Sequence, residues 1–326
     1  MTDQYLRKAS LIIGEVAGDA LDLSELRFSF VVKRGDTSTP NSARIRVYNM
    51  NPATMARVQK EFKRVVLQAG YEGNYGIIFD GTVVQTRRGR TSQVDTHLDI
   101  TAADGDAAYN FAYVSTTLAA GSTAQDHFNV AAQAMAKHGV GVGYTAGLQS
   151  NPLPRGKVMF GMARDVLACT ARNTETTWSI QDGKLQVVPE SSYMPSEIQV
   201  INSDTGMIGL PVQTQNGVQV RTLLNPNYKI GTLIELRPGS VQQLEYGLAN
   251  ADQPRNAFVQ VTNPLNANGY YYVMVAEHQG DTRGNDWYTD LICISADPTV
   301  IPSEEMQRRS TFGAIGPVPG AVKTNG

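Results

Sequence analysis

Cysteine is nearly absent from this chain of 326 residues, which contains only Cys169 and Cys293. Two cysteines cannot build the disulfide framework of a small secreted domain, and the sequence alone does not support a bridge between them. Cys169 falls at an apolar position of a predicted helix, so we expect it to be buried and unreactive. The composition indicates a reduced compartment, and we expect assembly in the cytoplasm.

Long hydrophobic runs are also missing. Stretches such as Leu11–Ile13 and Val65–Leu67 are far shorter than the roughly 20 apolar residues of a membrane-spanning helix. Glu15 and Asp19 interrupt the first 21 residues, so we expect no secretion signal with a basic start and an apolar centre.

An excess of charge of one sign is lacking too, because 28 Lys and Arg stand against 30 Asp and Glu. This balance argues against a nucleic-acid binder or a polybasic membrane protein, since both depend on a cationic excess. Cations gather only locally, at Arg57, Lys60, Lys63, Arg64, Arg87, Arg88 and Arg90. This basic patch is a candidate docking surface for an acidic partner. A solvated helix face plus a charged hairpin tip explains the same residues, and both interpretations remain open.

Residues that carry chemistry are scarce. No two of the four histidines stand at metal-ligand spacing, so we expect neither a metal nor a cofactor. His97 alternates with apolar residues, and we expect it to be exposed. His278 and Asp281 form a candidate base and orienting acid, but no Gly-x-Ser-x-Gly elbow supplies a nucleophile. We expect no catalytic site, although a carboxylate pair for glycoside hydrolysis would leave no motif.

The first third of the chain alternates apolar and polar residues with a period of two, which predicts antiparallel strands at 27–33, 43–48, 65–71, 76–86 and 93–102. Their polar outer faces favour a sandwich or barrel. One helix interrupts them. Asn51 is a suitable N-cap, Pro52 suits the first turn, and Met55, Val58 and Phe62 form an apolar stripe.

From about residue 105 the pattern becomes mixed α+β. Ser122-Thr-Ala-Gln125 predicts a capping box, followed by a buried stripe at Phe128, Ala131, Ala132 and Met135. A second helix is predicted over 162–172. Asp182-Gly183 between apolar runs predicts a tight β-hairpin.

Strand patterns return at 218–224, 228–236, 270–276 and 287–295, with a polar loop predicted at 245–256. The expected fold is mainly β, with two antiparallel β-barrel or sandwich domains flanking a small mixed α+β domain. The domains are expected at 1–104, 105–204 and 205–300, followed by an extended or disordered Pro/Gly-rich tail at 301–326.

Two segments resemble each other. Thr96-His-Leu-Asp-Ile-Thr-Ala-Ala-Asp104 and Thr289-Asp-Leu-Ile-Cys-Ile-Ser-Ala-Asp297 both follow a turn that contains Gly, Arg and Thr. The similarity hints at two related β domains around the mixed one.

The order and spacing of several runs resemble the baseplate hub proteins of contractile-tailed phages over about residues 25–295. These runs are Ser42-Ala-Arg-Ile-Arg-Val-Tyr-Asn-Met-Asn-Pro52, Val66-Leu-Gln-Ala-Gly-Tyr71, Ile78-Phe-Asp-Gly-Thr-Val83, Thr205-Gly-Met-Ile-Gly-Leu-Pro211, Val220-Arg-Thr-Leu-Leu-Asn-Pro226 and His278-Gln-Gly-Asp-Thr-Arg-Gly284.

The resemblance implies a homotrimer in which each subunit contributes two tube-type barrels to a ring of six. Such a ring adapts the threefold central spike to the sixfold tail tube. The implied partners are the spike, the tail tube or tube-initiator protein, and possible tape measure and baseplate wedge proteins. Genomic DNA would pass through the lumen without specific binding, and Asp95 and Asp99 are candidates to face it. The implied location is the tail baseplate of the virion.

Two rival functions remain open. A tail-associated peptidoglycan hydrolase would use a carboxylate pair or His278. A tail tube or tube-initiator protein would need only one barrel, whereas this chain has room for two. We expect edge strands of the barrels to pair between neighbouring subunits.

Overall fold

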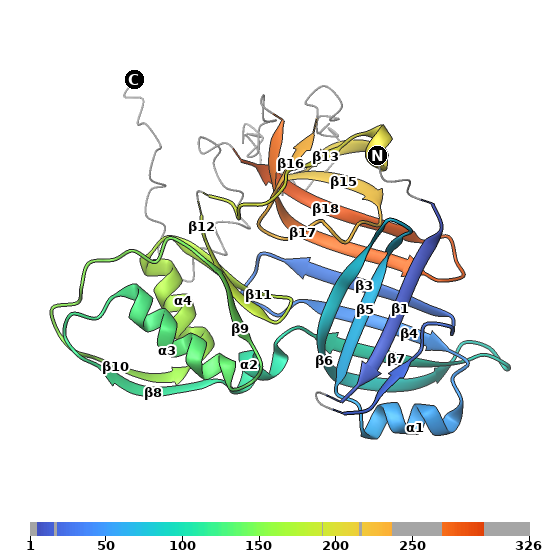
Figure 1. The fold of residues 1–326 in the computed structure, drawn as a ribbon, viewed down its shortest axis with the longest axis horizontal. Helices are drawn as coiled ribbons and strands as arrows, with labels where there is room; N and C mark the ends of the chain where they lie inside the picture. The colour runs from blue at the N-terminus through green and yellow to red at the C-terminus, as the bar shows by residue number, and fades with distance from the viewer. Residues whose placement is uncertain (1–4, 16–17, 191, 215–216, 237–268, 297–326) are drawn as a thin grey trace, which may run out of the picture.

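The computed structural model describes residues 5–15, 18–190, 192–214, 217–236 and 269–296. In these residues the chain is mainly antiparallel β-sheet with a smaller mixed part beside it (Figure 1). The expected fold class, mainly β with an α+β insertion, is confirmed. The predicted loop 245–256 and the tail 301–326 lie outside the described residues.

The first β unit contains seven strands and one helix. They are β1 (Arg7–Gly14), β2 (Ala20–Asp22), β3 (Phe28–Gly35), β4 (Ser42–Tyr48), α1 (Pro52–Lys60), β5 (Arg64–Tyr71), β6 (Asn74–Arg90) and β7 (Thr96–Ala103). Alternation of side chains places Phe28, Phe30 and Val32 in one core, as the sequence predicts. Strand β1 was not predicted, because its sequence does not alternate.

Helix α1 begins as predicted. The Asn51 side chain accepts the N–H of Ala53 at 2.9 Å, and Pro52 occupies the first helical position. Met55, Val58 and Phe62 pack into the core of the first unit. The opposite face of the helix therefore remains in solvent.

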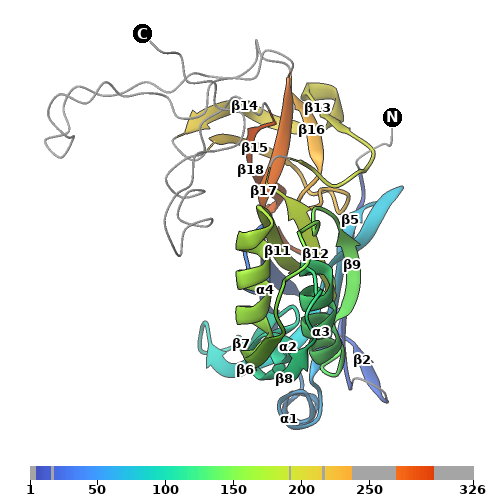
Figure 2. The same cartoon turned by 90° about the vertical axis from the view of Figure 1, so that its left-hand side faces the viewer.

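The middle part has its own core. Its elements are α2 (Asp106–Phe111), β8 (Tyr113–Leu118), α3 (Ala124–Ala136), β9 (Gly141–Thr145), β10 (Lys157–Met162), α4 (Ala163–Asn173), β11 (Thr176–Gln181) and β12 (Lys184–Pro189). Figure 2 shows α3 and α4 side by side next to the sheet β11-β12-β9. The predicted Asp182-Gly183 hairpin joins β11 to β12.

The capping box of α3 is one residue later than predicted. Asp126, rather than Gln125, accepts the backbone N–H and the hydroxyl of Thr123, at 2.8 and 2.9 Å. Thr123 is the N-cap instead of Ser122, which is buried. The helix begins where a carboxylate can reach back to the cap, and a Gln at that spacing is a weaker partner.

The second β unit contains β13 (Gln199–Ile201), the 3₁₀ turn η1 (Ser203–Thr205), β14 (Met207–Thr214), β15 (Gly217–Leu223), β16 (Leu233–Leu236), β17 (Tyr270–Asp281) and β18 (Trp287–Ser295). The strand predicted at 228–236 is formed only from Leu233 onward. Tyr228 and Ile230 produced the apolar pattern behind this prediction. Both side chains are buried, but the two residues belong to a loop that precedes β16.

The two β units share one strand-pairing pattern. In chain order their six main strands are β1, β3, β4, β5, β6, β7 and β13, β14, β15, β16, β17, β18. In each unit the second strand pairs with the third, the third with the sixth, the sixth with the fifth, the fifth with the fourth and the fourth with the first. The two units differ only at the pairing of the first and fourth strands, which is antiparallel for β1 and β5 and parallel for β13 and β16. The two similar sequence segments lie at the sixth strands, β7 and β18.

The two units join in a single sheet of 13 strands, because β17 pairs with β3. The antiparallel register runs from Val275 opposite Gly35 to Asp281 opposite Ser29. Trp287 of β18 packs on Phe30, with ring centroids 5.6 Å apart, and donates its indole N–H to the carbonyl of Gly70 at 3.2 Å. A side chain of the second unit thus completes the core of the first.

We predict that Trp287→Ala lowers the free energy of unfolding by about 3–5 kcal/mol, because the substitution opens a cavity in the core and removes an indole hydrogen bond. Trp287→Phe, the control, should cost clearly less, since the ring contact with Phe30 survives. Denaturant unfolding followed by circular dichroism measures both. A loss below about 1 kcal/mol for the alanine variant would contradict this role of Trp287 in joining the units.

Candidate functional site

The outward face of the sheet carries charged side chains that pair across neighbouring strands. Arg46 of β4 meets Asp99 of β7 at 2.6 Å, and Arg221 of β15 meets Asp290 of β18 at 2.7 Å. Two further pairs cross the β17–β3 joint, Lys33 with Glu277 at 3.3 Å and Arg27 with Asp281 at 2.8 Å. The alternation that buries one side of each strand places these residues on the other side.

The ion pairs keep the carboxylates of this face in their charged form. Hydrogen bonds from Arg46 hold the pKa of Asp99 below its usual range, and Arg27 does the same for Asp281. All four side chains are therefore charged at neutral pH. Within these four pairs each cation is matched by an anion, so the pairs together carry no net charge.

One candidate for the lumen was misplaced by sequence reasoning. Asp95 lies in the turn before β7 rather than on the strand face with Asp99. Its carbonyl accepts the N–H of Thr91 at 2.9 Å, and its carboxylate accepts the Asn49 amide at 2.9 Å. These contacts close the turn between β6 and β7, so β7 begins only at residue 96.

The seven cations of the predicted basic patch lie on or beside three elements. Arg57 and Lys60 lie on α1, Lys63 and Arg64 lie at the start of β5, and Arg87, Arg88 and Arg90 lie on β6; all seven are exposed. A hydrogen bond of 2.7 Å from Arg88 to the Gln59 side chain joins β6 to the helix.

Only two cations of the patch form ion pairs with described residues. Arg57 lies 3.2 Å from Glu61, and Arg64 lies 2.7 Å from Asp80. Among the described residues, Lys60, Lys63, Arg87, Arg88 and Arg90 have no carboxylate within 4.0 Å of their charged nitrogen atoms. The patch is therefore a locally positive surface on a chain that is nearly neutral.

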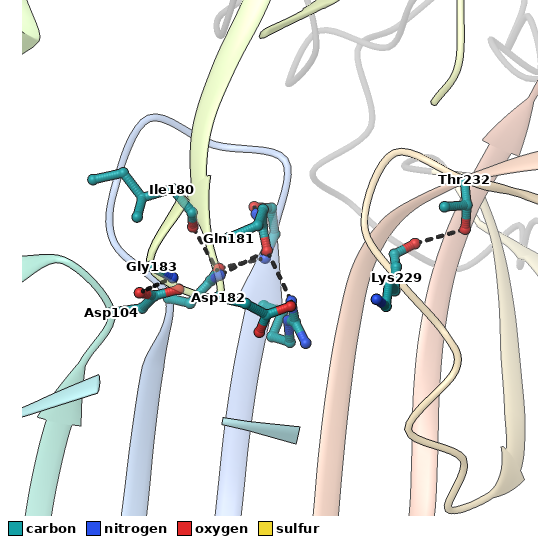
Figure 3. A network of polar contacts seen from close by, with 10 residues as sticks. Asp104, Ile180, Gln181, Asp182, Gly183, Lys229 and Thr232 are labelled. Atoms are coloured by element: carbon teal, nitrogen blue, oxygen red, sulfur yellow. Dashed lines mark hydrogen bonds and ion pairs between the residues drawn. The ribbon is translucent and has the colours of Figure 1, made fainter. Parts of the chain in front are cut away.

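A buried polar network fastens the middle part to the sheet (Figure 3). The turn between β11 and β12 needs left-handed backbone at Asp182 and Gly183, with φ of 54° and 70°. Asp182 binds the buried Arg34 guanidinium at 3.0 Å, and the Gly183 N–H donates to Asp104 at 2.9 Å. Asn41 donates to Gln181 at 2.8 Å.

Burial raises the pKa of Asp104 to about 6, because the hydrogen bond from Gly183 only partly offsets the loss of water. The sequence marks the Asp182-Gly183 turn but not its partners. Arg34 lies near the end of β3 and Asp104 directly follows β7, and both side chains are buried.

The residues considered for catalysis are not arranged for it. His278 is buried, its Nδ1 lies 2.8 Å from the Thr289 hydroxyl, and burial lowers its pKa to about 3. Asp281 pairs with Arg27 instead of orienting His278. A hollow of about 470 Å³ at the strand ends, lined in part by Arg27 and Arg283, contains the single carboxylate of Asp95. Within the described residues, neither the surroundings of His278 nor the hollow at the strand ends contains the two neighbouring carboxylic acids that glycoside hydrolysis requires.

Two expectations about single residues were wrong. His97 is mostly covered, with 11% of its side chain exposed, because the Thr91 hydroxyl lies 3.0 Å from its Nδ1 and the ring packs against Gly89. Cys169 is only partly buried, since it lies on the flank of α4 rather than on its core face. Cys169 and Cys293 are both free thiols.

No group of three metal-ligating side chains occurs within the described ranges. In the same ranges, no helix is long and apolar enough to cross a membrane. Neither finding adds a candidate site to the surfaces described above.

Two β units around a mixed middle part define the fold of this chain. The structure is similar to the 43 kDa tail protein of prophage MuSo2 from Shewanella oneidensis, with a TM-score of 0.57 and 9% identity over 91% of this chain and 99% of that one. It is also similar to a tail protein of Neisseria meningitidis, with a TM-score of 0.55 and 11% identity over 89% and 97%.

A third similar structure is a component of the Escherichia coli type VI secretion system, with a TM-score of 0.51 and 10% identity over 87% of this chain and 76% of that one. It is described as structurally similar to the T4 bacteriophage tail proteins gp27 and gp5. No curated protein sequence matches the chain.

Residues 43–254 match the model of the family described as baseplate hub gp41. The chain belongs to this baseplate hub family. It is a structural component of a phage tail baseplate, as the resemblance of its sequence predicts.

We predict that Asp104→Asn removes a pH dependence of stability. The pKa of Asp104 is about 6 in the folded chain and about 3.9 when unfolded, so its contribution is greatest below pH 4 and is lost as the pH rises through 6. The variant should be more stable than the parent at pH 8, by up to about 3 kcal/mol, and no more stable at pH 4.

Denaturant unfolding at both pH values measures this difference. The matched control is Asp165→Asn, an exposed carboxyl on α4, which should change stability little at either pH. An equal effect of Asp104→Asn at pH 4 and pH 8 would contradict the buried, protonatable state of Asp104.

Proposed function

We propose that this hub protein assembles as a homotrimeric ring that adapts a threefold central spike to a sixfold tail tube. The observation that carries the proposal is the repeated strand-pairing pattern within one chain. Three copies of a chain with two alike β units present six alike units on one side. On the other side the ring has the threefold symmetry of its three chains, which matches the symmetry of the spike.

The domain limits belong to the same proposal. The first barrel-type domain spans 1–104, the mixed domain 105–204 and the second barrel-type domain 205–300, and a tail of residues 301–326 follows. Three apolar clusters support three domains, one mainly in the first β unit, one in the middle part and one in the second β unit, and Ile201 of β13 belongs to the last of them. The β17–β3 pairing joins the two barrel-type domains in one sheet.

The proposed partners are further copies of the chain, the central spike and the tail tube or tube-initiator protein. Tape measure and baseplate wedge proteins are further candidates. The similar type VI secretion component, with its likeness to T4 gp27 and gp5, supports partners from the spike and the tail. DNA passes through the lumen unbound, and the matched charges on the outward sheet face suit such passage.

Assembly rather than catalysis is the proposed mechanism, and it takes place in the host cytoplasm. The buried state of His278 and the single carboxylate in the hollow at the strand ends give the hydrolase alternative no support. A tube protein needs one barrel-type unit, whereas this chain contains two.

The basic patch is the proposed docking surface for an acidic partner. Its support is that seven exposed cations lie on α1, at the start of β5 and on β6, where Arg88 contacts Gln59 of the helix, and five of them have no ion pair with a described residue. Acidic groups on a partner would find uncompensated positive charge there.

We predict that the purified chain has a mass in solution near three times 35.4 kDa, either alone or with a co-expressed spike protein. Light scattering behind size exclusion measures it. Zymography on the same sample is the control for the rival function, and no lytic band is expected. A monomer under both conditions would contradict the ring, and a lytic band would favour a wall hydrolase.

A further inference from the structure

The two-stranded sheet formed by β8 and β10 in the middle part has one buried face and one exposed apolar face. Met159 of β10 and Val114 of β8 belong to the core of the middle part, and α3 and α4 lie on that side of the sheet (Figure 1). Because side chains alternate along a strand, Val158 and Phe160 point the other way, and they are 73% and 76% exposed. No aromatic residue in the described ranges is more exposed than Phe160.

Tyr113 extends this apolar surface across β8. Its ring meets the Phe160 ring edge to face, with centroids 5.3 Å apart, and Tyr113 is itself 46% exposed. The register places Tyr113 opposite Met162, two residues along β10 from Phe160, so both rings lie on the same side of the sheet. We call this side the aromatic face, and its six residues, none of them charged, are Tyr113, Ser115, Thr117, Val158, Phe160 and Met162. A contiguous apolar surface of this kind is typical of a binding site for another chain segment.

The C-terminal segment has a sequence of matching chemistry. No residue in 310–322 is charged, and apolar side chains recur there at intervals of three, at Phe312, Ile315, Val318 and Ala321. A polyproline II helix has three residues per turn, so this spacing predicts a single apolar side in that conformation. Pro317 and Pro319 favour the conformation, because their rings fix φ near the polyproline II value. Segments of this type bind to surfaces lined with aromatic side chains.

The C-terminal segment is long enough to reach the aromatic face of its own chain. The last described residue is Ala296, directly after β18, and residues 297–311 separate it from Phe312. A fully extended stretch of that length spans about 50 Å. A compact chain of this size has a diameter of about 50 Å. A second copy of the chain is therefore not needed to supply the segment.

We propose that residues 312–321 lie across the aromatic face of their own chain as a polyproline II helix, with its apolar side against Tyr113 and Phe160. Neither surface carries a charge, so burial of apolar area drives the contact and salt does not weaken it. The contact does not depend on the proposed ring. It gives the C-terminal segment a binding site and the aromatic face a cover.

Photo-cross-linking of the full chain tests where the segment lies. Phe160 is replaced by benzoylphenylalanine, and we expect irradiation to join position 160 to residues 312–321, identified by mass spectrometry of the digested protein. The cross-linked chain should keep the mass of one chain on a denaturing gel, because the contact is within the chain. The matched control carries the same photoreactive residue at the exposed Val94, in the turn between β6 and β7, and should not react with residues 312–321.

Limited proteolysis of the full chain tests which side chains hold the segment. Trypsin cleaves after Arg309 and Lys323, which flank it, and a protease must bind residues on both sides of the cleaved bond. Cleavage therefore follows the fraction of chains in which the segment is released. Phe160→Ser and Ile315→Ser should each accelerate cleavage at these two sites by at least about fivefold, with the parent rate unchanged at high salt.

Two matched variants control for the substitutions. Val142→Ser changes an exposed residue of β9 in the other sheet of the middle part, and Ala314→Ser lies outside the row of every third residue. Both should leave the cleavage rates within about twofold of the parent rates. Near-UV circular dichroism checks that Phe160→Ser keeps the fold, which is expected because the side chain is exposed.

Two results would overturn the contact. One is a cross-link from position 160 that misses residues 312–321 or doubles the mass on the denaturing gel, which would assign the aromatic face to another protein or to a second copy. The other is an unchanged cleavage rate in both Phe160→Ser and Ile315→Ser. The mass of the parent in solution, which tests the ring, is a separate measurement, so failure of one proposal is distinguishable from failure of the other.

Discussion

Backbone hydrogen bonding at the edge of a sheet is the constraint on which this structure depends. A strand at the end of a sheet presents a row of N–H and C=O groups that need partners. In this chain β17 and β3 satisfy each other over residues 275–281 and 29–35. That one pairing turns two similar units into a continuous sheet, places Trp287 in the core of the first unit and brings Lys33 to Glu277 and Arg27 to Asp281.

The middle part is attached by different physics. Its apolar core is separate, and a buried polar network around Arg34, Asp104 and the Asp182-Gly183 turn connects it to the sheet. Such a network contributes modest net stability, but its hydrogen bonds have narrow geometric requirements. It therefore defines where the middle part sits more than it adds to the stability of the fold.

The baseplate role agrees with a structure in which two similar β units form one sheet and the middle part is attached separately. A hub must hold several other proteins in a defined symmetry, and duplication of one pairing pattern within a chain provides two alike surfaces from one fold. The groups that could have carried catalysis are engaged in structure instead. His278 hydrogen-bonds Thr289 inside the second unit, and Asp281 binds Arg27 across the joint.

The sequence by itself determined the local elements. Alternation located β3, β4, β5, β7 and β18, Asn51 and Pro52 located the start of α1, and Asp182-Gly183 located a hairpin, because these signals depend on neighbours along the chain. Only the tertiary structure decided the pairing of β17 with β3, the burial of Arg34 and Asp104, the partial burial of His97 and the partial exposure of Cys169. These features depend on residues that are distant in sequence, and neither periodicity nor composition records which distant strand or turn will cover a given side chain.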